Sequence, residues 1–170
     1  MDLVVVAADA AHDTVERATG ATLTHHCPRC GATDHGRPVA PGSSRHVSLA
    51  RSGPLAVVAL SDVPVGVDAE RTGTVDAAAV RAVGIEDDDP TRAWVRAEAR
   101  GKLTGEGLSG RGHRSASAVV TDVRVGHGLV VAVATWEPVL VRTSRAAGRA
   151  APADAATDPA GPPRRGRSSR

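Results

Sequence analysis

The chain has 170 residues, of which 41% are hydrophobic, which is enough for one ordinary domain or two very small ones. It contains no Phe, no Tyr and only two Trp, so the core must be built from Val, Leu and Ala. The net charge of +2 is unevenly distributed: residues 142–170 hold seven Arg and two Asp, which leaves the first 141 residues at −3. These numbers exclude a strongly basic folded domain, and nucleic acid is not an expected partner.

Two terminal segments bear on the class of protein. Residues 139–170, rich in Ala, Pro and Arg, have too few large apolar side chains to offset the entropy of ordering, so we expect a disordered tail. The N-terminal apolar stretch over 3–11 is interrupted by Asp9 and is too short to span a bilayer. It also lacks the basic start of a signal peptide. We expect a cytoplasmic protein with no membrane partner.

The elements of the first half follow from apolar runs and turn residues. A buried strand is predicted over 3–8, and a short helix over 13–19 ends at Gly20. Residues 23–44 are rich in Cys, His, Gly and Pro and are predicted to form a long loop. Three strands are predicted over 46–50, 55–60 and 63–69, separated by short turns.

The second half adds two helices and a hairpin. A weak helix is predicted over 75–83 and a longer one over 91–103, with Asp89 as N-cap and Pro90 next to it. Strands over 117–125 and 129–136 are predicted to pair across a turn that contains two glycines. The pattern predicts an α+β fold with mainly antiparallel strands and one long helix.

A set of carboxylates is the strongest chemical signal. Side chains alternate faces along a strand, so Asp68 and Glu70 project from the same side and are able to share one hard cation such as Mg²⁺. On the long helix, Trp94, Glu98 and Lys102 lie on one face, and Glu98 is the natural third ligand. Lys102 is the only lysine of the chain. The alternative interpretation is that Asp68 and Glu70 merely end a strand.

The Cys and His residues of the long loop allow several interpretations. Cys27 and Cys30 have the spacing of half a zinc knuckle, and His25, His26 and His35 lie near enough in sequence to complete four ligands. The alternative is a pair of reduced cysteines in a loop. A disulfide is not expected in a reducing compartment. The sequence alone does not decide whether Cys27 and Cys30 bind zinc.

Two further features have simple structural interpretations. The acidic run over 86–89 is interpreted as a solvated turn that starts the long helix, rather than as a metal site or a docking surface for a basic partner. Trp94 is interpreted as a core residue on the inner face of that helix, rather than as a stacking partner for adenine.

Five motifs in register resemble one known family. They are His-Gly-Arg-Pro over 35–38, His-Val-Ser-Leu-Ala-Arg-Ser-Gly over 46–53, Val-Gly-Val-Asp-Ala-Glu over 65–70, Trp-Val-Arg-Ala-Glu-Ala-Arg-Gly-Lys over 94–102 and Gly-Glu-Gly-Leu over 105–108. Over roughly residues 35–136 the chain resembles the 4′-phosphopantetheinyl transferases of the type that activates surfactin synthetase. The resemblance implies a pseudo-dimer of two similar lobes. We expect a reduced first lobe over 1–64, a second lobe over 65–138 and the tail over 139–170.

The resemblance also implies an activity and its residues. The family transfers the 4′-phosphopantetheine group from coenzyme A to a serine of an acyl or peptidyl carrier protein. It implies Mg²⁺ on Asp68, Glu70 and Glu98, with Glu98 as the base, acting directly or through a metal-bound water, and Lys102 as a charge on the phosphates. The expected coenzyme A contacts are Arg37, Pro38, Arg51, Ser52 and Lys102.

The family usually has Ser-His-Ser where this chain has Ala50, Arg51 and Ser52, so one histidine is replaced by an arginine that keeps the positive charge. The carrier protein is expected to dock near Leu103, Leu108 and Arg111. The alternative function is a catalytically degenerate relative that binds a carrier protein or a nucleotide, or a zinc-stabilised domain whose basic tail binds nucleic acid.

Overall fold

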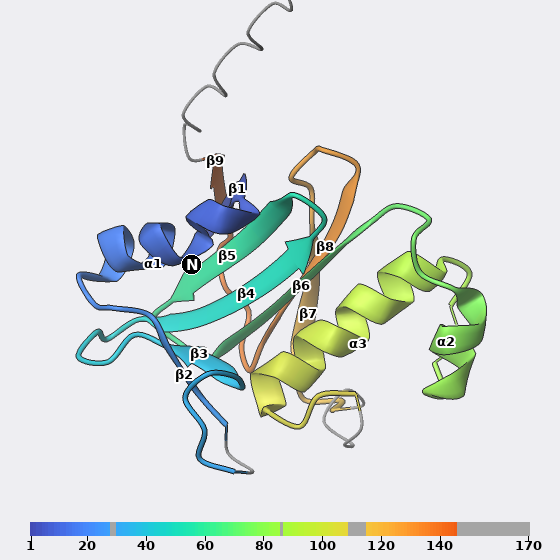
Figure 1. Ribbon diagram of the computed structural model, residues 1–170. Coiled ribbons are helices and arrows are strands. Elements are labelled where there is room, and N and C mark those ends of the chain that lie inside the picture. The colour runs from blue at the N-terminus through green and yellow to red at the C-terminus, as the bar shows by residue number, and fades with distance from the viewer. Residues whose placement is uncertain (28–29, 86, 109–114, 146–170) are drawn as a thin grey trace, which may run out of the picture.

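The computed structural model describes residues 1–27, 30–85, 87–108 and 115–145. The fold is α+β with mostly antiparallel strands, as predicted (Figure 1). One sheet has the strand order β4-β5-β1-β9, a second has the order β6-β8-β7, and β2 pairs with β3 in a small hairpin. Among the described residues, no helix is both long and apolar enough to cross a membrane.

The first sheet and its helix come from the start of the chain. The elements are β1 (Asp2–Ala7), the short 3₁₀ helix η1 (Ala8–Ala10), α1 (Ala11–Thr19), β4 (His46–Ser52) and β5 (Leu55–Ser61). Helix α1 ends as predicted at Gly20, which has a left-handed φ of 69° and donates its N–H to the Glu16 carbonyl. The three strands and the helix confirm the predicted order, with ends shifted by up to two residues.

The predicted loop over 23–44 contains two short strands. These are β2 (Thr24–His26) and β3 (Arg37–Val39), which pair antiparallel with His25 opposite Pro38. Three-residue strands are too short to show a period-2 pattern, and Pro within a run argues against a strand in the sequence. The prediction of a continuous loop was therefore wrong for these six positions.

The second sheet and the long helix come from the second half. The elements are β6 (Val65–Arg71), α2 (Ala77–Ala82), α3 (Pro90–Thr104), β7 (Val119–Val123) and β8 (Leu129–Thr135). The predicted hairpin of β7 and β8 is confirmed, and His127 has a positive φ of 60° in the turn between two glycines. The second half thus supplies one sheet, a short helix and the long helix.

A last strand lies where the sequence predicted the disordered tail. Residues 142–145 form β9 (Arg142–Arg145), which pairs parallel with β1. Arg142 Nε donates to Asp2 Oδ1 at 3.1 Å, and all four residues of β9 are exposed. Backbone pairing and an ion pair hold this strand without burial of apolar side chains, so hydrophobic patterning gave no sign of it. The rest of the predicted tail, residues 146–170, lies outside the described residues.

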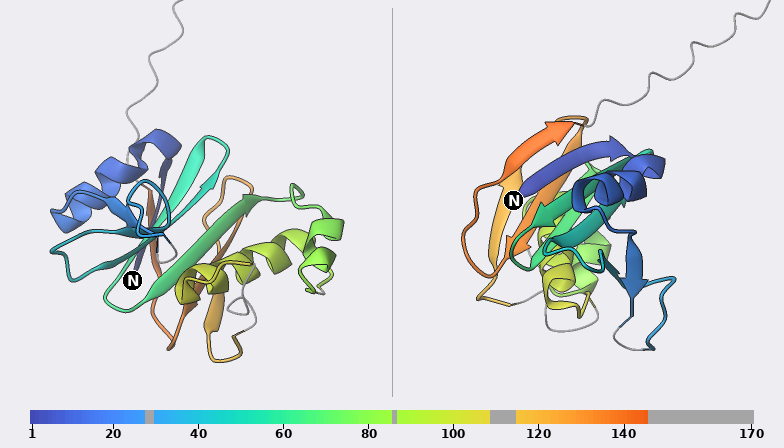
Figure 2. Two further views of the ribbon diagram at one scale, coloured as in Figure 1. Left: turned by 60° about the horizontal axis from the view of Figure 1, so that its bottom comes forward. Right: turned by 90° about the vertical axis from the view of Figure 1, so that its left-hand side faces the viewer.

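Alternating faces of the strands build three apolar layers. Between the two sheets lies a core that includes Leu3 and Val57 from the first sheet and Val67 and Val133 from the second. The opposite face of the first sheet packs against α1, and the opposite face of the second packs against α3. The two helices therefore lie on opposite outer sides of the strands, as the left view of Figure 2 shows. Val, Leu and Ala make up these layers, as the composition predicted.

Side chains join the two sheets where β4 and β6 meet. The Oγ atom of Ser48 accepts from Val67 N, and that of Ser52 accepts from Arg71 N, each at 3.0 Å. Both contacts join residues 19 positions apart, so the two strands run parallel. We call this contact between β4 and β6 the seam; it places Arg51 at the level of Glu70.

Candidate functional site

Helix α3 begins and ends where its sequence signals predict. Asp89 caps its first turn by accepting from Arg92 N at 3.1 Å, and Pro90 follows. At the other end, Gly105 has a φ of 80° and donates to the Gly101 carbonyl at 2.9 Å. These two caps fix the register of the helix, and with it the positions of the side chains that face β6.

Gly66 allows α3 to lie directly on β6. A Cβ atom at this position would overlap the Ala99 carbonyl oxygen and would lie only 2.5 Å from Leu103 N. The group that approaches Gly66 closely is therefore the backbone of the helix. Residues 66, 68 and 70 face the helix, because Val65, Val67 and Ala69 point into the core between the sheets.

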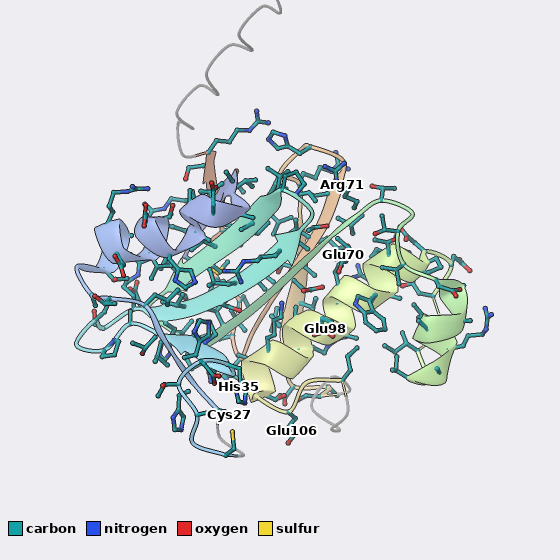
Figure 3. All side chains as sticks on the ribbon, viewed as in Figure 1. Cys27, His35, Glu70, Arg71, Glu98 and Glu106 are labelled. Carbon is teal, nitrogen blue, oxygen red and sulfur yellow. The ribbon has the colours of Figure 1, made fainter. Side chains whose placement is uncertain are left out.

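The direction of α3 brings Glu98 toward the acidic end of β6. Gly66 lies beside the end of the helix, while Gly73 N donates to Thr91 Oγ1 near its start, at 3.2 Å. Strand and helix therefore run antiparallel, and Glu70 lies at the level of the helical turns around Glu98. Glu98 is one turn before Lys102 on the same face. Figure 3 labels Glu70 on β6 and Glu98 on the adjacent helix.

Lys102 joins the helix to both sheets. Its Nζ atom donates to Asp68 Oδ1 at 2.7 Å, to the Val67 carbonyl at 3.0 Å and to the Leu49 carbonyl at 3.1 Å. The two carbonyls belong to β6 and β4, on either side of the seam. A buried carbonyl needs a donor, and the ammonium supplies one to each. In this structure the only lysine of the chain thus has a structural role, which the sequence did not predict.

Asp68 has one carboxylate oxygen in use and one that is not. Oδ1 pairs with Lys102, whereas Oδ2 is buried and has no hydrogen-bond partner among the described residues. The residue is only 6% exposed. A buried carboxylate oxygen without a donor is costly, and such an atom marks a place where an ion or a water belongs. The Oδ2 atom therefore fits a metal ligand.

Glu70 lies beside Asp68, and burial together with the negative charge of Asp68 raises the pKa of Glu70. Burial, and after it the charge of Asp68, raises the pKa of Glu70, while the hydrogen bond from Ser52 Oγ to Glu70 Oε2 at 3.2 Å lowers the pKa. Two neighbouring carboxylates that repel each other are relieved by a shared cation. Asp68 and Glu70 are thus a chemically reasonable pair of oxygen ligands for Mg²⁺.

The three predicted metal ligands do not form a closed cage here. Among the described residues, the group of three potential ligands whose atoms all lie within 4.8 Å of one another is made by Cys27, Cys30 and His35, not by carboxylates. Asp68, Glu70 and Glu98 are therefore brought to one helix–strand contact with their oxygens farther apart than a bound ion requires.

The predicted coenzyme A contacts lie on two neighbouring elements. Arg51 is exposed on β4, at the level of Glu70 across the seam, and its charge contributes to a lowered pKa of His25 on β2, after burial and the nearby His12. Arg37 and Pro38 are partly exposed on β3, which pairs with β2. These two arginines thus lie on β3 and β4, whereas the cation that contacts Asp68 is Lys102.

Ser52 lies at the seam instead of facing a ligand. It is 7% exposed, and its hydroxyl both accepts from Arg71 N and donates to Glu70 Oε2. A hydrogen bond donated by this hydroxyl to coenzyme A would have to replace the one that it donates to Glu70. In the structure, Ser52 acts on the site through Glu70.

The acidic run and Trp94 both lie at the start of α3. Asp87 forms a salt bridge with Arg92 at 2.6 Å, and this salt bridge lowers the pKa of Asp87. Part of the acidic run therefore does organise the start of the helix. Glu86 lies outside the described residues. Trp94 is partly buried rather than fully enclosed.

An open depression of about 670 Å³ lies between α2 and the start of α3, away from Asp68. Its lining includes Val80, Ile85 and Arg92.

Only part of the predicted docking surface is available. Leu103 is 2% exposed and lies on the face of α3 that packs against β8, so the prediction that it contacts a partner at the surface was wrong. Leu108 is partly exposed, and Arg111 lies outside the described residues. Leu103 lies at the end of the long helix, where the sequence predicts the docking surface, but this side of the helix is covered by β8.

No family model matches this chain, and no curated protein matches it. The functional interpretation therefore depends on the residues described above and on the motifs that carry the resemblance.

Proposed function

We propose that the chain transfers 4′-phosphopantetheine from coenzyme A to a serine hydroxyl of an acyl or peptidyl carrier protein, with Mg²⁺ as cofactor. The observation that carries the proposal is the buried Oδ2 atom of Asp68, which has no hydrogen-bond partner in the described part of the chain. It lies beside Glu70, on the strand that is covered by the helix of Glu98 and Lys102. The motif order over residues 35–108 and the two helix-covered sheets support the same family.

The metal would be held by Asp68 Oδ2 and Glu70, with Glu98 drawn in as the third ligand. All three offer carboxylate oxygens, the ligands that Mg²⁺ prefers. When bound, Mg²⁺ would neutralise charge on the pyrophosphate of coenzyme A. Closing this set of ligands requires the side chains of Glu70 and Glu98 to approach each other across the contact between β6 and α3.

The chain's own groups would perform the remaining steps. The serine oxygen forms a bond to the β-phosphorus while the bond from that phosphorus to the oxygen of 3′,5′-ADP breaks, and Glu98 takes the serine proton. Lys102 would supply positive charge close to the same phosphates. Its contact with Asp68 keeps the ammonium in place before the substrate arrives.

The arginines near the small hairpin would bind the rest of coenzyme A. Arg51 stands beside the seam at the level of Glu70, and Arg37 lies on β3. A guanidinium binds phosphate oxygens through two parallel hydrogen bonds. An anionic ligand that spans from the carboxylate site toward β3 would thus meet positive charge along its length. We place the reaction in a reducing compartment such as the cytoplasm, because Cys27 and Cys30 are not joined in a disulfide.

The test is the intact mass of an apo carrier protein incubated with the chain, coenzyme A and Mg²⁺, with and without EDTA. We expect a gain of about 340 Da, the mass of one phosphopantetheine arm, that is lost with EDTA. Glu98→Gln should abolish the gain, while the control Glu137→Gln, on the exposed side of the chain, should keep it.

Absence of transfer to several unrelated carriers by folded protein would overturn the catalytic proposal. Coenzyme A affinity, measured by calorimetry on the same sample, then separates the two remaining cases. Retained binding would identify a degenerate relative that holds a nucleotide or carrier, and loss of binding would overturn the family assignment as well.

A further inference from the structure

In the part of the chain that the structure describes, a compact group of metal-ligating side chains lies outside the proposed transfer site. The sulfur atoms of Cys27 and Cys30 and a ring nitrogen of His35 all lie within 4.8 Å of one another. The Cys30 Sγ atom is 3.3 Å from His35 Nε2. In a tetrahedral zinc site, the usual bond lengths put sulfur and nitrogen ligands about 3.5 Å apart. The distance between Cys30 and His35 is thus close to the spacing that a zinc ion imposes, and Cys27 lies within reach of the same ion.

The backbone is shaped to bring the three residues together. The Gly31 N–H donates to the Cys27 carbonyl at 2.8 Å, and the Cys27 N–H donates to the Ala32 carbonyl at 2.9 Å. Gly31 has a positive φ of 73°, a conformation that side chains disfavour. The two hydrogen bonds hold the backbone of residues 31 and 32 against Cys27, and Cys30 directly precedes this segment.

A second glycine returns the chain to the same point. Gly36 has a φ of 98°, and a Cβ atom there would lie 2.5 Å from the His26 carbonyl oxygen and 2.6 Å from the Cys27 Cα. Only a residue without a side chain allows this approach. The contact places His35, the preceding residue, against the cysteines, as the neighbouring labels of Cys27 and His35 in Figure 3 indicate.

An acidic neighbour orients the histidine ring. Asp34 Oδ1 is 2.7 Å from His35 Nδ1, so the proton of the neutral ring is held at Nδ1 and the lone pair of Nε2 points to the cysteines. A carboxylate behind a histidine ligand is the usual outer contact of a zinc-binding histidine. Two thiolates and an imidazole are soft donors that favour Zn²⁺ over Mg²⁺ or Ca²⁺.

We infer that Cys27, Cys30 and His35 bind one Zn²⁺ ion that closes the loop between β2 and β3. Water completes the tetrahedron, since the compact group among the described residues consists of these three. Cys27 is buried and Cys30 is exposed, so the ion reaches the site from the solvent side. Because Arg37 begins β3 only two residues after His35, the ion fixes the base of the hairpin that carries this arginine.

The test measures metal content, not transferase activity, so it is independent of the proposed function. The full chain is expressed with added zinc, dialysed without chelator and analysed by mass spectrometry for zinc. We expect about one zinc per chain in the wild type. Cys30→Ser and His35→Asn should lose most of it. The matched control is His26→Asn, an adjacent histidine on β2 outside the group of three, which should keep the metal.

A second measurement uses only the wild-type protein, so the inference is still tested if the variants fail to fold. Replacement of zinc by Co²⁺ should produce a thiolate-to-cobalt charge-transfer band, and removal of the metal should lower the melting temperature. Wild-type protein that is folded but holds no zinc after dialysis would overturn the inference. So would equal zinc in Cys30→Ser and His26→Asn, or thiol titration that finds Cys27 and Cys30 joined in a disulfide.

Discussion

The Lys102 Nζ atom lies 2.7 Å from Asp68 Oδ1 while it also donates to main-chain carbonyls of β4 and β6. A single ammonium thus ties the long helix to both sheets at the seam. In the proposed reaction the same ammonium faces the phosphates, so Lys102 contributes both to the stability of the fold and to catalysis. The free energy of unfolding and the transfer activity therefore have to be measured separately.

Removal of the lysine charge should destabilise the fold. In Lys102→Met, the buried Asp68 carboxylate keeps its charge without a partner, and we expect a loss of about 3 kcal/mol in the free energy of unfolding. Urea denaturation at pH 7 measures it. The double variant Lys102→Met/Asp68→Asn should recover part of the loss, because the unpaired charge is gone. Equal stability of the single variant and wild type would contradict the bridging role.

Glu70 should make stability depend on pH in a defined direction. Its folded pKa is raised above the ordinary value of 4.5, so the ionised form is less stable in the folded chain than in the unfolded chain. This penalty is absent below the unfolded pKa and is complete once the pH has risen through the folded pKa. Without metal, Glu70→Gln should therefore melt at a higher temperature than wild type at pH 7.

Two conditions check the origin of that difference. At about pH 3.5, below the unfolded pKa, wild type and Glu70→Gln should melt together, because both side chains are neutral. At pH 7, added Mg²⁺ should raise the melting temperature of wild type and leave Glu70→Gln unchanged, since only the carboxylate pair binds the ion. A variant less stable than wild type at pH 7 without metal would contradict the raised pKa.

The contact between α3 and β6 should not tolerate a side chain at Gly66. Gly66→Ala forces a methyl group against the backbone of Ala99 and Leu103, and backbone cannot move aside as a flexible side chain does. We expect a loss of about 3 kcal/mol or more, measured by chemical denaturation. Gly42→Ala is the control: its Cβ meets nothing within 4 Å, and its positive φ should cost only about 1 kcal/mol.

The seam between β4 and β6 should depend on the serine hydroxyls. Ser48→Ala leaves the buried Val67 N–H without its acceptor, which should cost about 2 kcal/mol of unfolding free energy. Ser52→Ala should cost a similar amount, because Arg71 N loses its acceptor. The exposed Ser117→Ala is the control and should stay within about 0.5 kcal/mol of wild type. A loss confined to coenzyme A binding in Ser52→Ala, with stability unchanged, would instead favour the ligand contact predicted from the sequence.

The sequence alone determined most of the local structure. Apolar alternation located the strands, and Asp89, Pro90 and Gly105 located the ends of the long helix, because these signals act within a few residues of the chain. Spacing also placed Asp68 and Glu70 on one face of β6 and Glu98 and Lys102 on one face of α3. Local periodicity is sufficient for that.

Only the tertiary structure decided how these faces meet. The close contact at Gly66 and the three acceptors of Lys102, among them Asp68, depend on residues 33 to 53 positions apart in the chain. The same is true of β9, which pairs through its backbone with β1, 140 positions earlier in the chain. For Cys27, Cys30 and His35, spacing left three histidines in question, and the approach of Gly36 to Cys27 selected one. Sequence patterns report what each residue does to its neighbours along the chain, whereas partners across the fold are set by how the layers pack.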